Sequence, residues 1–154
     1  LKEFFNGLLL VLKNKVTNIS VELDIDPTFE VFGSKVGLSQ AFMNLVVNAA
    51  DAIEDHPPTR SSGKINIAAQ DSQDFVLVKV SDNGKGMPPE VRERIFDPFF
   101  TTKAPGKGTG LGLHIVMNEV KREGGRIEVT STPNVGTEFS VYWPKKQLLQ
   151  KEAA

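Results

Sequence analysis

The chain has 154 residues, a formal net charge of −1, 40% hydrophobic residues and no cysteine. The balanced charge gives no strong basic field for nucleic acid, and the missing thiols exclude disulfides, cysteine catalysis and cysteine-ligated zinc. No apolar run approaches the roughly 20 residues of a membrane span and no signal-peptide pattern opens the chain, so we expect one globular domain over residues 1–154.

Hydrophobic spacing predicts two helices and three strands in the first half of the chain. Apolar residues recur at helical spacing near the N-terminus and again after Ser34, which we place as an N-cap. The second helix is expected to end before a proline- and serine-rich loop that reaches Gly63. In chain order, the predicted elements are a helix over residues 3–13, an edge strand over 21–23, a helix over 34–53 and a hairpin of strands 65–69 and 75–80 around the turn 71–74.

A long irregular segment interrupts this pattern between residues 83 and 112. It is rich in glycine and proline, and loops of this length are usually functional or disordered. The elements predicted after it are a helix over 110–123 ended by the glycine pair 124–125, strands over 126–131 and 137–143, and a charged tail at 145–154. The whole pattern favours a layered α/β domain, with an antiparallel-rich sheet covered on one face by helices.

One face of the long helix carries an unusual set of polar side chains. At about 100° per residue, five amides and acids fall within an arc of roughly 80°, opposite the apolar face. An ordinary solvated face is the competing interpretation, but such faces favour Glu, Lys and Arg. Amide and carboxylate oxygens are hard ligands suited to Mg²⁺ beside nucleotide phosphates. This polar stripe consists of Gln40, Asn44, Asn48, Asp51 and Asp55.

Two glycine-containing segments each allow two interpretations. Residues 82–87 either form a hairpin turn or bring the backbone close to a ligand, with Asp82 accepting a hydrogen bond from an exocyclic amine and so selecting adenine over guanine. Residues 106–112 precede a helix whose free N–H groups suit phosphates, and the alternative is a flexible hinge without a ligand. The glycine spacing of residues 106–112 matches neither the P-loop nor the dinucleotide fingerprint.

Four apolar residues of the irregular segment could belong to a simple core, but we interpret them as the anchor of a lid that closes over a ligand. They are Ile95, Phe96, Phe99 and Phe100. The two histidines offer no nucleophile–base pair, because His56 lies beside two prolines and His114 looks like a semi-exposed helix residue. Hydrolysis by a catalytic triad and a histidine-rich metal site are therefore not expected.

These segments, in this order, resemble the ATP-binding domain of the GHKL superfamily: gyrase, ninety-kilodalton heat-shock chaperones, sensor histidine kinases and mismatch-repair proteins. They resemble the histidine kinases most. The similar segments are residues 44–52 for the N box, 82–87 for the first glycine box, 95–103 for the F box, 108–116 for the second glycine box and 136–139 for the last. The resemblance implies an α/β (α+β) two-layer sandwich, with about three helices on a mixed, mostly antiparallel sheet and an ATP lid over residues 88–109.

The resemblance also implies a role for each box in binding ATP and Mg²⁺. Asn48 is expected to bind Mg²⁺, supported by Asn44 and Asp51, and Asp82 to accept from the adenine amino group. Lys103 is expected to reach the terminal phosphate, so Asn44 and Lys103 are the candidate catalytic residues. The other expected nucleotide contacts are Ala52, Gly84, Gly86, Met87, Ile95, Phe100, Gly108, Thr109, Gly110, Leu111, Gly112 and Thr137.

Two residues narrow the choice within the superfamily. Asn44 stands where hydrolytic members and serine kinases usually carry Glu, and an amide cannot accept a proton from water or a hydroxyl. Asp51 stands where many histidine kinases carry Lys, which resembles a nitrogen-regulation-like subgroup. The chain is therefore expected to transfer a phosphoryl group to an outside acceptor rather than to hydrolyse ATP.

The implied function is that of the catalytic, ATP-binding domain of a two-component sensor histidine kinase, presenting the γ-phosphoryl of Mg-ATP to a histidine on a dimerisation domain for relay to a response regulator. No segment resembles the acceptor motif, so we expect residues 1–15 to lead in from an upstream domain. The intact protein is expected to be a homodimer, cytoplasmic or anchored to a membrane with this domain on the cytoplasmic side, and the isolated domain a monomer. The alternatives are a nucleotide-sensing module without phosphotransfer and a hydrolytic ATPase.

Overall fold

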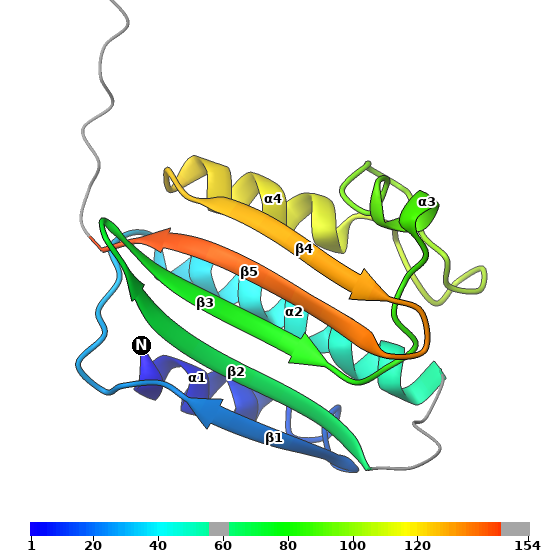
Figure 1. Cartoon of the computed structure of the whole chain (residues 1–154), viewed down its shortest axis with the longest axis horizontal. Helices are drawn as coiled ribbons and strands as arrows, with labels where there is room; N and C mark the ends of the chain where they lie inside the picture. The colour runs from blue at the N-terminus through cyan, green and yellow to red at the C-terminus, as the bar shows by residue number, and fades with distance from the viewer. Residues whose placement is uncertain (56–61, 146–154) are drawn as a thin grey trace, which may run out of the picture.

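A computed structural model describes residues 1–55 and 62–145 of the chain. Its strands form one sheet in the order β1-β2-β3-β5-β4 (Figure 1), in which β1 runs parallel to β2 and the other neighbouring strands are antiparallel. The strands are β1 (Ile19–Asp24), β2 (Gly63–Ser72), β3 (Phe75–Asp82), β4 (Arg126–Thr132) and β5 (Gly136–Pro144). The predicted edge strand is β1, which pairs with β2 alone among the described strands.

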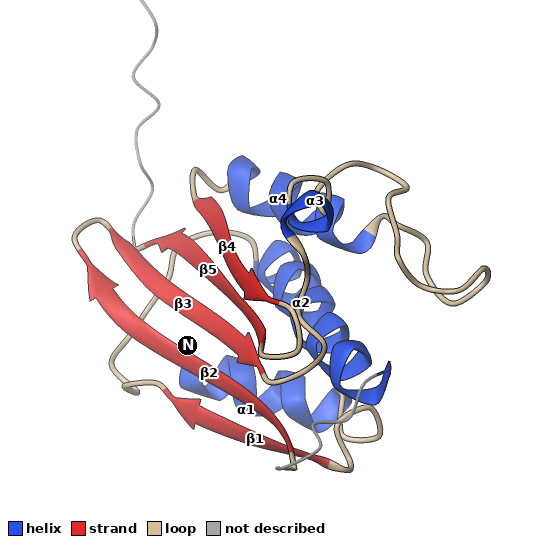
Figure 2. Cartoon of the chain, turned by 45° about the vertical axis from the view of Figure 1, so that its right-hand side comes forward, coloured by secondary structure: helices blue, strands red, loops and turns tan. Residues whose placement is uncertain are grey.

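Three helices cover one face of the sheet, as Figures 1 and 2 show together. They are α1 (Lys2–Val11), α2 (Lys35–Asp55) and α4 (Gly112–Arg122). A short helix, α3 (Pro89–Arg92), lies beyond the end of α4, next to a long loop that projects from the domain (Figure 2). The expected α+β sandwich, with helices on one face of a mixed sheet, is confirmed.

The core lies between the sheet and the helix layer. Inward residues of β3 and β5 alternate with less buried ones, as expected for strands with one covered face. The ring of Phe42 on α2 lies 5.0 Å from that of Phe5 and 6.1 Å from that of Trp143, measured between centroids. Trp143 donates its indole N–H to the Phe32 carbonyl at 2.7 Å, so its buried polar atom has a partner. This packing orients α2 and leaves its polar face turned away from the core.

Several element boundaries differ from the predicted ones. Ser72 and Phe75 are still paired, so the β2–β3 turn has two residues, and Gln73 adopts a φ of 54° in it. The long helix α2 continues to Asp55, two residues past its predicted end. The Ser34 hydroxyl accepts from the Gly37 amide at 3.2 Å, which confirms Ser34 as the N-cap. The hydrophobic pattern does not predict α3, because one turn is too short to show a period.

The hairpin interpretation of residues 82–87 is wrong. Asn83 continues the pairing with β2 instead: its amide donates to the Lys64 carbonyl at 3.2 Å, and its side-chain oxygen accepts from the Lys64 amide at 2.7 Å. The chain then leaves the sheet and enters the irregular segment. Asp82 is thereby held at the end of β3, where the sheet stops.

Two predicted features lie outside the described residues: the proline-rich loop with His56, and the charged tail beyond residue 145.

The first helix is shorter than its predicted span, because α1 ends at Val11 and turns follow it. None of the described helices combines the length and the apolarity that crossing a bilayer requires.

Candidate functional site

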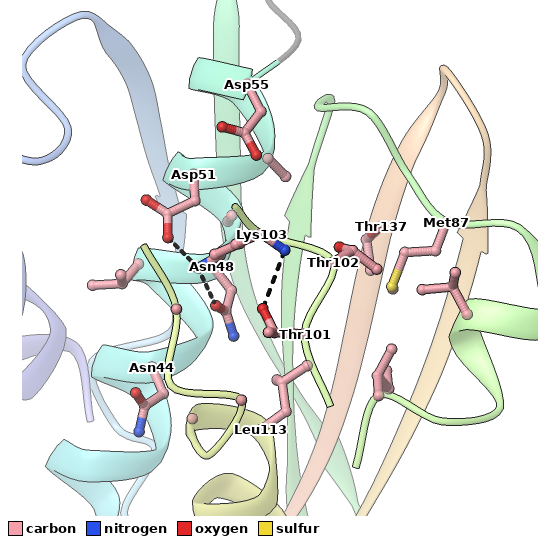
Figure 3. A pocket seen from close by; sticks show the side chains of 18 of the residues that line it. Asn44, Asn48, Asp51, Asp55, Met87, Thr101, Thr102, Lys103, Leu113 and Thr137 are labelled. Atoms are coloured by element: carbon pink, nitrogen blue, oxygen red, sulfur yellow. Dashed lines mark hydrogen bonds and ion pairs between the residues drawn. The ribbon is translucent and has the colours of Figure 1, made fainter. Parts of the chain in front are cut away.

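A cavity of about 520 Å³ lies between the polar face of α2, the ends of β3 and β5, and the segment 88–109, which we call the lid segment. Figure 3 shows Asn44, Asn48 and Asp51 along one face of α2, with Lys103 reaching the last two. Every predicted box contributes to the lining. The predicted site residues in it are Asn44, Asn48, Asp51, Ala52, Asp82, Gly86, Met87, Ile95, Phe100, Lys103, Gly108, Thr109, Gly110, Gly112 and Thr137.

Two expected nucleotide contacts, Gly84 and Leu111, do not belong to this lining. A Cβ at Gly84 would lie 2.6 Å from the carbonyl carbon of Ala52, so glycine is required there for close packing on α2. Leu111 is the N-cap residue of α4, and its carbonyl accepts from the Ile115 amide at 2.9 Å. Packing against α2 and capping of α4 are the roles that the structure gives these two residues, and their contacts with a nucleotide stay predictions.

Sequence reasoning missed several residues at the site. Lys85 pairs with Asp55 at 2.9 Å, although the polar stripe had indicated only the acid. Ser131 lies behind the lining, where its hydroxyl accepts from the Met87 amide at 2.8 Å and lies 2.9 Å from the Thr137 hydroxyl. No local pattern signals these long-range contacts. The other unpredicted lining residues are Val47, Ala49, Val91, Thr101, Thr102, Gly106, Lys107, Leu113 and Phe139.

Asp82 supplies a half-buried carboxyl group at one end of the cavity. Burial raises its pKa from 3.8 to about 6, although the backbone amides of Gly84 and Thr137 donate to it and act in the opposite direction. The Gly84 amide lies 2.9 Å from the carboxylate. Apolar side chains, including Met87 and Ile95, line the cavity nearby. A carboxylate in such a setting suits an exocyclic amine and opposes a carbonyl oxygen, because it has only acceptors when ionised.

The polar face of α2 supplies oxygens that converge on positive charge. Lys103 Nζ lies 3.3 Å from the amide oxygen of Asn48 and also pairs with Asp51. Lys15 binds the other oxygen of Asp51 at 2.6 Å and reaches Glu54 at 2.7 Å. Burial acts to raise the pKa of Asp51, but hydrogen bonds from Lys103 and Lys15 outweigh it, so the pKa is lowered. Asp51 is therefore a stable anion at neutral pH.

This donor set fits a Mg²⁺ ion. The ammonium of Lys103 stands in for a cation, because the same position contacts both the Asn48 amide oxygen and the Asp51 carboxylate. Mg²⁺ prefers oxygen ligands, keeps several waters and takes few protein ligands beside phosphates. Within the described ranges no cluster of three or more His, Cys, Asp or Glu could hold a metal, so the phosphates and waters would supply the remaining ligands.

The glycine-rich residues 106–112, which we call the glycine-rich arm, connect the lid segment to the N-terminus of α4. This helix has no side-chain cap, so its first N–H groups are available to an anion. Gly110 has a φ of 69°, and a Cβ there would lie 2.4 Å from the carbonyl carbon of Phe99. Only glycine permits this turn. Asn44 borders the same helix end, since its side-chain oxygen would lie 3.2 Å from a Cβ at Gly112.

The lid segment has a smaller apolar anchor than the sequence predicts. Ile95 is buried, and Phe96 and Phe100 pack partly against the core. Phe99 is 73% exposed and has a φ of 66°, so it does not belong to the anchor. Its backbone conformation serves the sharp turn that meets Gly110 instead.

Residues 33–147 match the family described as histidine kinase-, DNA gyrase B- and HSP90-like ATPase. The chain belongs to this ATPase family. One relative, the sensor kinase CckA of Brucella abortus (strain 2308), is 36% identical over 149 residues, which cover 89% of this chain and 16% of CckA. The sensor histidine kinase ZraS of Escherichia coli O157:H7 is 42% identical over 107 residues, 70% of this chain and 22% of ZraS. The chain thus spans about a fifth of the length of these curated relatives.

Solved structures of histidine kinases share the fold of this ATPase-family member. The nucleotide-free catalytic domain of the histidine kinase ThkA has a TM-score of 0.78 and 32% identity, covering 94% of this chain and 92% of that one. The mycobacterial sensor histidine kinase MprB has a TM-score of 0.79 and 27% identity, covering 96% and 95%. The expected resemblance to the histidine kinase ATPase domain is confirmed.

Proposed function

We propose that this ATPase-family member binds Mg-ATP in the cavity and presents its γ-phosphoryl group to a histidine on a separate dimerisation domain, for relay to the receiver domain of a response regulator. One observation carries the proposal. The same cavity holds an amine acceptor at Asp82, a cation-binding pair at Asn48 and Asp51, and the uncapped N-terminus of α4. These are the chemical groups that adenine, Mg²⁺ and phosphates require.

Each residue would have a separate task in this site. Asp82 would accept from the adenine amino group, which fixes the base and excludes guanine. Asn48 and Asp51 would hold Mg²⁺, whose charge offsets that of the phosphate oxygens. Lys103, released from Asp51, would turn to the terminal phosphate, while the α4 amides hold the phosphate chain. Positioning and charge neutralisation account for most of the catalysis in phosphoryl transfer.

Asn44 favours transfer over hydrolysis. Its side chain borders the phosphate-binding end of the cavity, and its amide nitrogen donates to the Gln40 carbonyl at 3.0 Å. An amide cannot remove a proton from water, so no base is available at this position. Asn44 would instead help to position the phosphates and their bound cation, and the acceptor must come from outside this chain.

For the intact protein we propose a homodimer whose dimerisation domain carries the acceptor histidine. The acceptor part of this proposal is supported by CckA and ZraS, which are sensor kinases several times longer than this chain. Because the proposed reaction consumes ATP, we place this domain on the cytoplasmic side. The isolated chain would be a monomer that binds either nucleotide.

We expect the isolated chain to bind ATP without labelling itself or releasing phosphate appreciably. His114 lies on α4 outside the cavity lining, and Asn44 supplies no base. Incubation with γ-labelled ATP, followed by separate assays for acid-labile protein label and free phosphate, tests this. Adding a dimerisation domain in trans should label its histidine at low efficiency, since no tether raises the local concentration. Steady phosphate release that Asn48→Ala abolishes would establish a hydrolase instead.

We also expect Mg-ATP to slow hydrogen exchange in the lid segment. Its described hydrogen bonds are mostly short-range, and such segments open locally at low free-energy cost. Phosphates that contact both the glycine-rich arm and the N-terminus of α4 should slow hydrogen exchange in the lid segment by about tenfold or more. Exchange in the β2–β3 hairpin is the internal reference. Strong protection of residues 88–109 before nucleotide is added would contradict a lid that closes on its ligand.

A further inference from the structure

Two side chains carry the hydrogen bonds that join the lid segment to the rest of the described chain. Apart from a local turn between Thr109 and Leu111, these bonds belong to Lys103, which reaches α2, and to His114, which reaches Phe96 from α4. The sequence suggests no role for this histidine beyond that of a semi-exposed helix residue. The structure places it at the base of the lid segment.

The hydrogen-bond partners of His114 fix its tautomer. Nδ1 lies 3.0 Å from the carbonyl oxygen of Phe96, which can only accept, so Nδ1 carries the hydrogen. Nε2 is then the acceptor, and it lies 3.1 Å from the side-chain amide of Asn118, one helical turn further along α4. Asn118 thus holds the half-buried ring in the orientation that directs Nδ1 at the lid segment.

A bound ligand would affect the hydrogen bonds of Lys103 and the hydrogen bond of His114 differently. Lys103 occupies the oxygens of Asn48 and Asp51, so a cation bound there must displace it. His114 and its partner carbonyl face each other outside the cavity lining, so a ligand in the cavity need not displace their bond. Phe96 adjoins Ile95, which lines the cavity, and Phe100 lines it four residues later.

We propose that His114 is a positioning residue of the nucleotide site. Its Nδ1–H bond fixes the base of the lid segment on α4, while the side chain of Lys103 exchanges between α2 and the phosphates. By holding Phe96, it keeps Ile95 and Phe100 in place against the ligand. The consequence for nucleotide affinity rests on the proposed function, whereas the anchoring itself does not.

Substituting His114 with asparagine or glutamine distinguishes the roles of its two ring nitrogens. The amide of His114→Asn can take the place of Nδ1 and keep the bond to Phe96, whereas the amide of His114→Gln takes the place of Nε2 and loses it. Gln is a better helix former than His, and Asn is similar to His, so a purely helical effect would favour the Gln variant. Asn118→Ala tests the second contact of the ring, because it keeps the Nδ1 bond and removes only the Nε2 partner.

The experiment measures hydrogen exchange over residues 95–100 in the nucleotide-free chain, and then the affinity for Mg-ATP. Losing one hydrogen bond should speed exchange roughly two- to tenfold in His114→Gln and His114→Leu, with His114→Asn close to wild type and Asn118→Ala between them. Affinity should fall by at most this factor, and by the full factor only where the open lid already predominates, because apparent affinity follows the fraction of chains with a competent lid. Wild-type exchange in both the Gln and Leu variants would overturn the proposal. If wild type failed to bind ATP, the proposed function would fall, and exchange would still decide the anchor.

Discussion

Replacing Asp82 with Asn is expected to weaken ATP binding about 10- to 100-fold, because a hydrogen bond to a charged acceptor contributes roughly 1.5–3 kcal/mol. The same change should stabilise the nucleotide-free fold. Burial holds the carboxyl pKa at about 6 against an ordinary value of 3.8, so keeping Asp82 ionised costs the folded state up to about 3 kcal/mol. Asn has a similar shape and carries no charge.

The size of this stability change depends on pH. Below pH 3.8 the carboxyl is protonated in both the folded and the unfolded chain, and the variant gains nothing from the missing charge. As the pH rises from there to about 6, the unfolded chain releases its proton first, so wild type loses stability relative to the variant. Above that range the difference is complete. The advantage of Asp82→Asn should therefore grow with pH and then level off.

Calorimetric titration with ATP and GTP, and denaturant unfolding across this pH range, measure both effects. Asp24→Asn removes the same charge from an exposed position on β1 and is the matched control. We expect wild type to discriminate strongly against GTP, whose carbonyl oxygen would face the carboxylate. If GTP bound as tightly as ATP, Asp82 would not contact the base. A variant less stable than wild type well above pH 6 would contradict the assigned cost of burial.

Replacing Asn48 with Ala is expected to reduce the affinity for ATP by about tenfold or more in the presence of Mg²⁺ and by much less in its absence. The variant loses the amide oxygen that the Lys103 ammonium contacts at 3.3 Å. Asp51 then remains as the partner of any cation at this position. Because alanine is the stronger helix former, α2 should not be weakened by the change.

Titrations of each variant with ATP, in the presence and in the absence of Mg²⁺, show whether Asn48 binds the metal or a phosphate. Gln40→Ala removes an amide from the same stripe of α2, but Gln40 is exposed and absent from the cavity lining, so its affinity should stay at the wild-type value. Equal losses for Asn48→Ala with and without Mg²⁺ would move the metal to other ligands. Unfolding curves of both variants check that the fold persists.

Local patterns were sufficient for the parts of this protein that depend on neighbouring residues. Helical spacing in α2 separates a core face from the polar face that carries Asn44, Asn48 and Asp51, because successive turns align residues that are three or four apart. The N-cap at Ser34 is equally local. Ordered boxes along the chain indicated the ATPase family and the groups that converge on one cavity.

Only the tertiary structure decided which groups meet across the fold. Lys103 contacts Asn48 and His114 contacts Phe96 although 55 and 18 residues separate them. Periodicity indicates which face of an element is buried and not what covers that face. It therefore predicted neither the contacts of Lys15 and Lys103 with Asp51 nor the partner of His114. The same reason explains Gly84: its spacing suggested a ligand contact, but packing against the backbone of α2 is what excludes a side chain there. Contacts of this kind follow from how α2, α4 and the sheet pack together, which no single stretch of sequence encodes.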